Sequence, residues 1–356
     1  GLNSALGSYL AGRPLTTRLV AAERERRLRH PYPLMAADLK DGRGGLRTLQ
    51  SFGWERRRAV MTGIPAPHSE TPAEREAHRM LLAVRNGLHA TAGRALDAFV
   101  PDAREGAARW LGTDLWETSA HLTRALRTGD QLATQRWPDL MADRAEATRA
   151  RRIRSRLRRQ VKPAVEGRRP LALARVATAG GGGIRLAAAD QEVIAAARSH
   201  GWADTDREDL IALLEQGVRG KAAFDWLDSL GWVDAAMPEL SHTMAAPQLA
   251  PFHDHPVDSH LWRTVDEMRL MIDGPEEWYS AIAAEVGDRR LLLLAAFVHD
   301  IGKARPGDHS EVGGDMAEVM LARIGFDDLA APVSRLVRLH LLLAATAANR
   351  DTSDRR

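Results

Sequence analysis

Hydrophobic residues recur along most of this chain at the three- and four-residue spacing of amphipathic helices. Within residues 73–100, for example, Met80, Leu81, Val84 and Leu88 fall on one helical face. Similar patterns cover residues 46–60, 106–135 and 190–240. Alanine, leucine and arginine are abundant and β-branched runs are few, which favours helices because unbranched side chains lose little rotamer freedom there. The pattern predicts a mainly α protein.

The stretch from Leu291 to Lys303 departs from this amphipathic pattern. It is apolar on every side before it reaches His299 and Asp300, which are adjacent. A helix without a polar face is buried, and this one is too short to cross a membrane. Burying an imidazole and a carboxylate without partners is costly. A metal ion is therefore the candidate partner of this pair.

Three further histidines lie near helix ends or on apolar faces in the same region. His260 falls in the first turn of a helix for which Asp258 is a suitable N-cap. His309 lies in a turn just before a helix, and His340 continues a stripe that includes Leu336. Taken singly, each histidine has the alternative of a hydrogen-bonded core residue. Together with Asp300, they form a nitrogen and oxygen donor set suited to a divalent metal.

Lys303 follows the His-Asp pair closely and is placed to neutralise the charge of a phosphate. The alternative interpretation is an exposed lysine in a loop. A metal bound beside it polarises a phosphoryl oxygen and lowers the pKa of a bound water.

Composition narrows the function classes. The chain has 356 residues with 44% hydrophobic residues, enough for a sizeable core, and a net charge of only +3. This balance gives no case for nucleic-acid binding. Cysteine is absent, so histidine and carboxylate are the available metal ligands. We find no signal peptide and no apolar run near 18 residues, and therefore expect a cytoplasmic protein without membrane contact.

Three glycine-rich or charged segments have both a functional and a structural interpretation. Asp38–Arg47 contains three glycines but lacks a preceding strand and a Gly-Lys-Ser/Thr, so a structural turn packed by Leu46 and Leu49 is favoured over a phosphate cradle. The basic residues between Arg149 and Lys162 lack interleaved aromatics, which favours a solvated helix face over a nucleic-acid patch. Gly180–Gly183 reads as a flexible loop.

Four segments together resemble one known family. They are Asp38-Leu-Lys-Asp-Gly-Arg-Gly-Gly-Leu-Arg47, Val84-Arg-Asn-Gly-Leu-His89, Phe252 to His260, and Val298 to Glu311. In this order they resemble the bifunctional PII uridylyltransferase/uridylyl-removing enzymes, and the His-Asp region resembles the HD phosphohydrolase superfamily. The nucleotidyltransferase site and the ACT domains of that family have no counterpart that we can find. Asp204-Thr-Asp206 lacks the strand and Gly-Ser that a transferase site needs.

The resemblance implies a fold, a site and a partner. It implies a helical region at 1–180, a helical connector at 181–250 and an all-α HD domain at 251–356. It further implies a divalent metal, Mg or Mn, as the only cofactor, with Asp300 and Lys303 catalytic and the nucleotidylated PII protein as substrate, from which UMP or AMP is removed. The metal ligands implied are His260, His299, Asp300, His309, His340 and Asp351.

Two other functions remain open at this point. One is an HD hydrolase of free nucleotides, although such an enzyme has no need of the Asp38–Arg47 segment. The other is a non-catalytic region that docks PII, although the expected ligands are all present.

Overall fold

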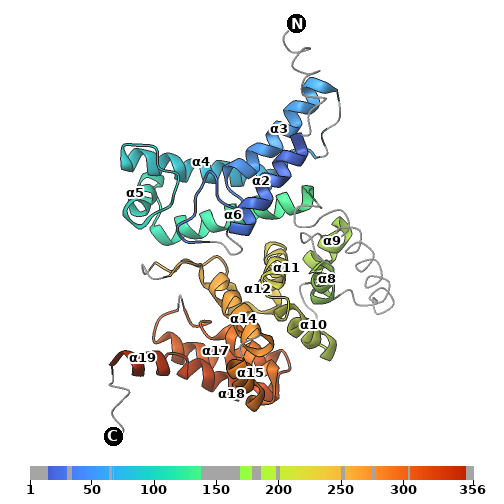
Figure 1. Ribbon diagram of the computed structural model, residues 1–356, viewed down its shortest axis with the longest axis vertical. Coiled ribbons are helices and arrows are strands. Elements are labelled where there is room, and N and C mark those ends of the chain that lie inside the picture. The colour runs from blue at the N-terminus through green and yellow to red at the C-terminus, as the bar shows by residue number, and fades with distance from the viewer. Residues whose placement is uncertain are drawn as a thin grey trace. The chain divides into compact units, whose positions relative to one another are not determined.

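The computed structural model describes residues 15–29, 34–63, 66, 68–137, 169–178, 186–197, 201–249, 253–274, 277–303 and 305–349. Regular structure in these residues is helical throughout (Figure 1), and the only β-type pairing among them is an isolated bridge between Asp38 and Ala98. The prediction of a mainly α fold is confirmed. The basic cluster between Arg149 and Lys162, the Gly180–Gly183 run and Asp351 lie outside the described residues.

The chain divides into two compact units, each assembled from separate segments. The first takes Gly1–Lys162, Ala177–Ala187 and Ala245–Pro256, and the second takes Pro163–Val176, Ala188–Met244 and Val257–Arg356. Residues 188–244, which precede the predicted HD domain, therefore belong to the same compact unit as the metal-ligand candidates.

The first unit is a helical assembly with an apolar core. Its helices are α2 (Leu15–Arg29), α3 (Leu46–Thr62), α4 (Pro72–Ala92), α5 (Pro101–Leu111) and α6 (Leu115–Arg136). The α4 stripe predicted from the sequence is buried: Leu81, Val84 and Leu88 have no exposed surface. The predicted helix over 73–100 ends earlier, because Gly93 adopts a left-handed conformation with φ of 62°.

The glycine-rich segment at Asp38–Arg47 allows a close backbone approach to α6. At Gly44, where φ is 71°, a Cβ would lie 1.9 Å from the carbonyl oxygen of Leu126. At Gly129, a Cβ would lie 2.2 Å from the carbonyl oxygen of Gly44. Leu46 and Leu49 are buried beneath the turn. These contacts support the interpretation as a structural turn, since only glycine fits between the two backbones.

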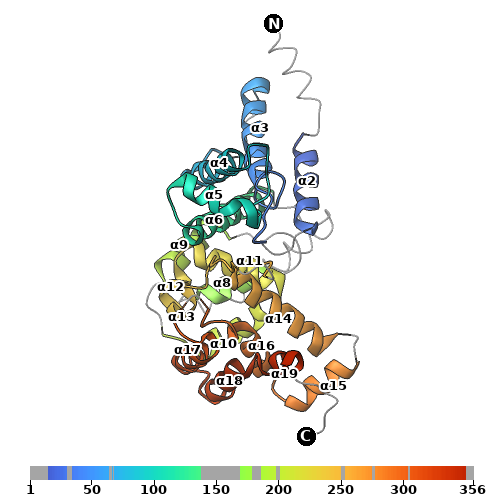
Figure 2. The same cartoon turned by 90° about the vertical axis from the view of Figure 1, so that its left-hand side faces the viewer.

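The second unit contains the remaining helices, and Figures 1 and 2 show them from two sides. The order is α8 (Pro170–Thr178, whose last two residues are assigned to the first unit), α9 (Ala188–Ala196), α10 (Asp204–Leu214), α11 (Val218–Ser229), α12 (Trp232–Ala236), α13 (Pro238–Ser241), α14 (Val257–Asp273), α15 (Glu277–Val286), α16 (Arg289–Val298), α17 (His309–Arg323), α18 (Asp327–Leu339) and α19 (Leu342–Asn349). The apolar helix α16 packs against α14 and α18, and α17 packs along α18.

Two local predictions in this unit are corrected. Asp258 is not an N-cap, because α14 already begins at Val257 and the Asp258 carboxylate forms an ion pair inside the unit. Leu336, which was predicted to lie on the buried stripe of its helix, is 42% exposed, whereas Val333 and Val337 are buried.

Asp204 and Asp206 lie in the first turn of helix α10. The Asp206 carboxylate accepts a hydrogen bond from the backbone N–H of Ala203.

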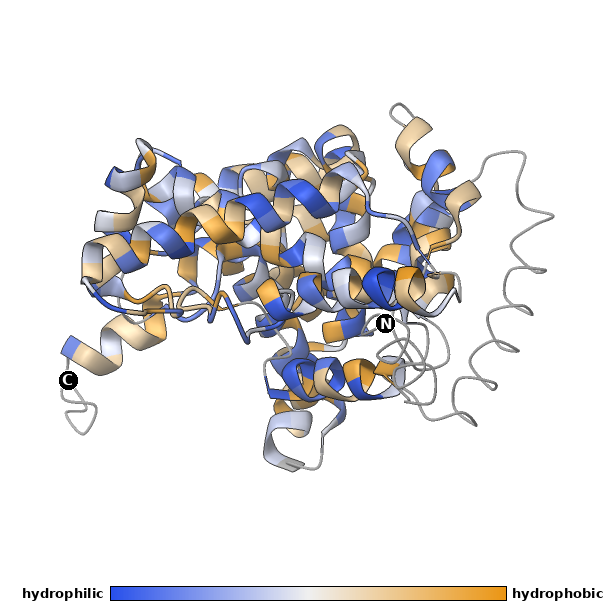
Figure 3. Cartoon of the chain, turned by 90° about the horizontal axis from the view of Figure 1, so that it is seen from above, coloured by the Kyte–Doolittle hydropathy of each residue, from blue (hydrophilic) through white to orange (hydrophobic). Residues whose placement is uncertain are grey.

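Within the described residues, one helical stretch, Asp327–Asn349, is long and apolar enough to cross a membrane on length and composition alone. The expectation that no run of this length exists does not hold for it. The stretch comprises α18 and α19. In Figure 3, the helix next to the C-terminus is coloured as apolar along most of its length. A single stretch of this kind is weak support for a membrane span, because a helix in a protein core passes the same test.

Candidate metal centre

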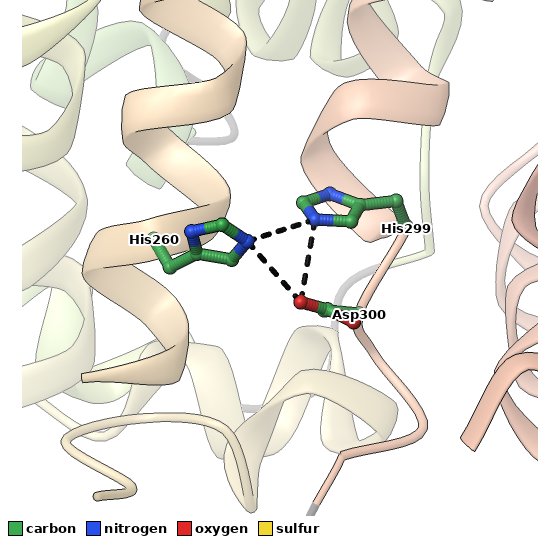
Figure 4. A group of neighbouring side chains, drawn as sticks. All are labelled: His260, His299 and Asp300. Carbon is green, nitrogen blue, oxygen red and sulfur yellow. Dashed lines mark hydrogen bonds and ion pairs between the residues drawn. The ribbon is translucent and has the colours of Figure 1, made fainter. Parts of the chain in front are cut away.

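Two neighbouring helices supply the first half of the histidine cluster. His260 is in the first turn of α14, and His299 and Asp300 directly follow the last residue of α16. Because α14 and α16 pack side by side, the three side chains meet between them (Figure 4). The Nε2 atoms of His260 and His299 are 3.0 Å apart, and they lie 3.2 and 3.3 Å from Oδ2 of Asp300.

A tight turn after Asp300 brings the second half of the cluster to the same carboxylate. At Gly302 a Cβ would lie 2.2 Å from the carbonyl oxygen of His309 and 2.6 Å from the backbone nitrogen of Gly313. Glycine therefore lets this turn lie directly against the start of α17. His309 is the first residue of α17 and follows the N-cap Asp308, whose carboxylate accepts hydrogen bonds from two backbone N–H groups.

His340 reaches the cluster from the end of α18. Its Nε2 lies 3.5 Å from Oδ1 of Asp300, and the Nε2 of His309 lies 3.6 Å from the same oxygen. Asp300 thus presents one oxygen to His260 and His299 and the other to His309 and His340. The potential ligand atoms form two groups, each within 4.8 Å, which share Asp300.

Backbone carbonyls orient two of the imidazoles. Nδ1 of His299 is 2.9 Å from the carbonyl oxygen of Ala296, and Nδ1 of His340 is 2.6 Å from that of Val337. In both cases Nδ1–H is the donor, since a carbonyl oxygen only accepts. The neutral ring then carries its lone pair on Nε2, the atom that faces Asp300. This arrangement, with Nδ1 held by hydrogen bonding and Nε2 free to bind, is the usual one for histidine ligands.

The electrostatics of Asp300 fit a bound cation. Asp300 is 2% exposed, and its two carboxylate oxygens lie between 3.2 and 3.6 Å from the four imidazole Nε2 atoms. Burial raises the pKa of Asp300, but the imidazoles of His260, His299 and His340, when protonated, donate to the carboxylate and hold its pKa below its usual range. The hydrogen bond to Asp300 in turn raises the pKa of His340. When the rings are neutral, their Nε2 lone pairs and the buried carboxylate together form a set of donor atoms that fits a divalent metal.

The structure brings together five of the six predicted metal ligands and the predicted catalytic lysine. Nζ of Lys303 is 2.8 Å from Oδ2 of Asp300, so this residue is part of the cluster rather than an isolated loop lysine. The sixth predicted ligand, Asp351, lies outside the described residues.

Sequence reasoning missed His242. Its Nε2 is 2.8 Å from the carbonyl oxygen of Ile301, and Arg305 approaches its Nδ1 at 3.5 Å. His242 therefore holds the turn that carries Asp300 and Lys303. No local pattern signals this contact, because it joins residues 59 positions apart.

Comparisons with known proteins agree with this geometry. Residues 257–355, which carry the whole described cluster, match the HD domain family, and residues 16–135 match the GlnD PII-uridylyltransferase family. These matches confirm the resemblance predicted from the sequence.

Several curated relatives bear the name bifunctional uridylyltransferase/uridylyl-removing enzyme. The chain is 32% identical to the one from Streptomyces coelicolor, over 94% of the chain and 42% of the relative. It is 28% identical to the one from Mycobacterium tuberculosis, over 89% of the chain and 41% of the relative. It is 35% identical to the one from Vibrio cholerae, over 42% of the chain and 18% of the relative. The first two alignments span less than half of each relative. No solved structure matches the chain.

Proposed function

We propose that this chain carries a metal-dependent phosphodiesterase that removes a nucleotidyl group, UMP or AMP, from the PII signalling protein. The observation that carries the proposal is Asp300, a buried carboxylate whose two oxygens each face a pair of imidazole Nε2 atoms. The relatives' names supply the reaction, since they include uridylyl removal. The reaction takes place in the cytoplasm, where we expect the protein to be.

The proposed ligands fall into two groups that share Asp300. His260 and His299 would hold one ion with Oδ2 of Asp300, and His309 and His340 would hold a second with Oδ1. Nitrogen and carboxylate donors suit Mn²⁺ and, with more oxygen ligands, Mg²⁺. A bound ion supplies Lewis-acid polarisation of the phosphoryl group and a water of lowered pKa.

The chain's own residues have separate roles in this proposal. The carbonyls of Ala296 and Val337 keep the Nδ1 protons in place, so the Nε2 atoms of His299 and His340 stay available as ligands. The ammonium group of Lys303 lies beside Asp300, where its positive charge would attract and stabilise the anionic phosphodiester. His242 and the glycine at 302 fix the turn that delivers both residues.

The test is turnover of UMP-modified PII, AMP-modified PII, free nucleotides and bis(p-nitrophenyl) phosphate, each with Mn²⁺, Mg²⁺ or a chelator. We expect metal-dependent release from modified PII, with the preferred nucleotide identified by the faster substrate. His299→Ala should abolish it. The matched control is His121→Ala, which changes an exposed histidine on α6 and should leave turnover unchanged.

Three results would count against parts of the proposal. Turnover of free nucleotides alone would favour an HD hydrolase of small molecules. Metal binding without turnover of any substrate would favour a region that docks PII. Wild-type turnover by the His299 variant would contradict the site itself.

A further inference from the structure

Helix α11 lies outside both family matches, yet it packs against the helix that carries His260. The HD match begins at residue 257, whereas α11 spans Val218–Ser229. Both helices belong to the second unit. We infer that Lys221 of α11 is a positioning residue for the metal centre, and that it acts through a buried ion pair with Asp258. This inference rests on the proposed metal centre and names a part of its support.

The ion pair itself is fully enclosed. Nζ of Lys221 lies 3.0 Å from Oδ2 of Asp258, and the two side chains are 3% and 2% exposed. Lys221 also pairs with Asp225, one turn further along α11. A buried lysine between two carboxylates is costly to desolvate, so this arrangement contributes to the geometry of the two helices more than to net stability.

The contacts along α11 and α14 form a continuous antiparallel seam. At Gly220 a Cβ would lie 2.7 Å from Cζ3 of Trp262, and at Gly217 a Cβ would lie 1.9 Å from Oδ1 of Asp266. The pairs Gly217 with Asp266, Gly220 with Trp262 and Lys221 with Asp258 advance along α11 as they go back along α14. The close approach at the glycines allows the short lysine bridge at the end of the seam.

Aromatic packing extends this support to the second metal-bearing helix. The ring centroids of Phe224 and Trp262 are 5.5 Å apart, and that of Phe297 lies 5.7 and 5.6 Å from them. Phe297 is on α16, two residues before His299. Helix α11 therefore contacts both helices that supply the first ligand group.

The position of Asp258 links the seam to the ligand. Asp258 is in the first turn of α14, two residues before His260. Fixing its carboxylate fixes the start of the helix, and with it the direction in which His260 projects. Residues that orient metal ligands typically change metal affinity about 10- to 100-fold when they are replaced.

The experiment compares two asparagine substitutions in the full chain. Asp258→Asn removes the ion pair between the two helices but leaves Lys221 paired with Asp225. Asp225→Asn removes the pair within α11 but leaves the link to Asp258. Both variants keep one carboxylate beside the buried lysine, so their folding costs should be similar. Mn²⁺ affinity is measured by titration calorimetry, and Co²⁺ absorption spectra report the ligand geometry.

We expect Asp258→Asn to weaken Mn²⁺ binding about 10- to 100-fold and to alter the Co²⁺ spectrum, whereas Asp225→Asn keeps both within about threefold. Lys221→Met should behave like Asp258→Asn, and Lys221→Arg, which keeps the charge, should restore much of the affinity. If Lys221→Met does not fold, the asparagine pair still decides the question.

The outcomes separate this inference from the proposed function. Wild-type affinity and spectrum in Asp258→Asn would overturn the positioning role and leave the metal centre intact. Equal losses in Asp258→Asn and Asp225→Asn would also overturn it, because they would show a general packing effect. Absence of Mn²⁺ binding by the wild-type chain would overturn the proposed metal centre, and this inference with it.

Discussion

Buried acids occur in both units, and they differ in the groups that surround them. In the first unit, Glu74 lies 2.6 Å from Arg136 and 2.8 Å from Arg56, and Glu23 lies 2.9 Å from Arg26. In the second unit, Asp300 faces four imidazoles and one lysine.

The difference lies in what the partners can offer to a third species. A guanidinium is always protonated and has no lone pair, so an Arg–Glu pair is complete by itself. A neutral imidazole carries a lone pair, so several of them around a carboxylate form a set of donors that a cation completes. The nature of the partner, rather than burial of the acid, distinguishes a structural carboxylate from a candidate ligand.

The largest effect that we predict is for Asp300→Asn. The amide has nearly the shape of the carboxylate but loses the anionic oxygens that both ligand groups share. Mn²⁺ affinity should fall by more than about 100-fold, a larger change than those seen for residues outside the ligand set. Calorimetric titration measures the affinity, and circular dichroism should show unchanged helix content. Affinity within tenfold of wild type would refute the central role of Asp300.

For Glu74→Gln in the first unit, we predict the reverse: lower stability with unchanged Mn²⁺ affinity. It leaves the buried guanidinium of Arg136 without its carboxylate partner, which should destabilise that unit by about 3 kcal/mol. Urea unfolding, together with hydrogen exchange of α4, measures this loss, and Mn²⁺ affinity should not change. Glu76→Gln on the same helix is the control, because its pair with Arg79 is exposed and its loss should have little effect. A change in metal affinity in Glu74→Gln would remove the distinction between the two kinds of acid.

The smallest predicted effect concerns Asp97, a partly exposed acid of the first unit. Partial burial raises its pKa, but hydrogen bonding and charge interactions with Arg85, Lys40 and His89 outweigh this and hold the pKa below its usual value. The folded pKa is then below the unfolded value of about 3.9, so the stabilisation is present above that pH and is lost as the pH falls through the folded pKa.

Because a quarter of the Asp97 side chain is exposed, its contribution should be below about 1 kcal/mol. Unfolding midpoints measured between pH 6 and 2.5 should fall less steeply on acidification in Asp97→Asn than in the wild type. Parallel curves would show that Asp97 contributes nothing to the acid sensitivity.

The sequence was sufficient to predict the helical class and most of the histidine cluster. The adjacency of His299 and Asp300 after an apolar helix is a local signal, and the positions of His260 and His340 follow from helical spacing. Leu336 was misplaced because spacing defines a broad face but not its exposed edge. Asp258 was interpreted as an N-cap because an aspartate before an apolar helical pattern is a local signal for one. Its actual partner, Lys221, lies 37 positions earlier in the chain.

Contacts between distant segments explain the rest of what was missed. The hydrogen bond of His242 to Ile301 and the seam between α11 and α14 depend on tertiary packing, which periodicity does not encode. The sharing of Asp300 between two ligand groups depends on the direction of each carboxylate oxygen, which periodicity does not encode either.

The alternation of segments between the two units has a consequence for synthesis. The backbone N–H of Met35 donates to the carbonyl of Asp254, and the Arg104 side chain donates to the carbonyl of Leu249. The first unit therefore completes these contacts only after about 120 residues beyond α6 have been synthesised. The two units therefore cannot complete their folding strictly one after the other during synthesis.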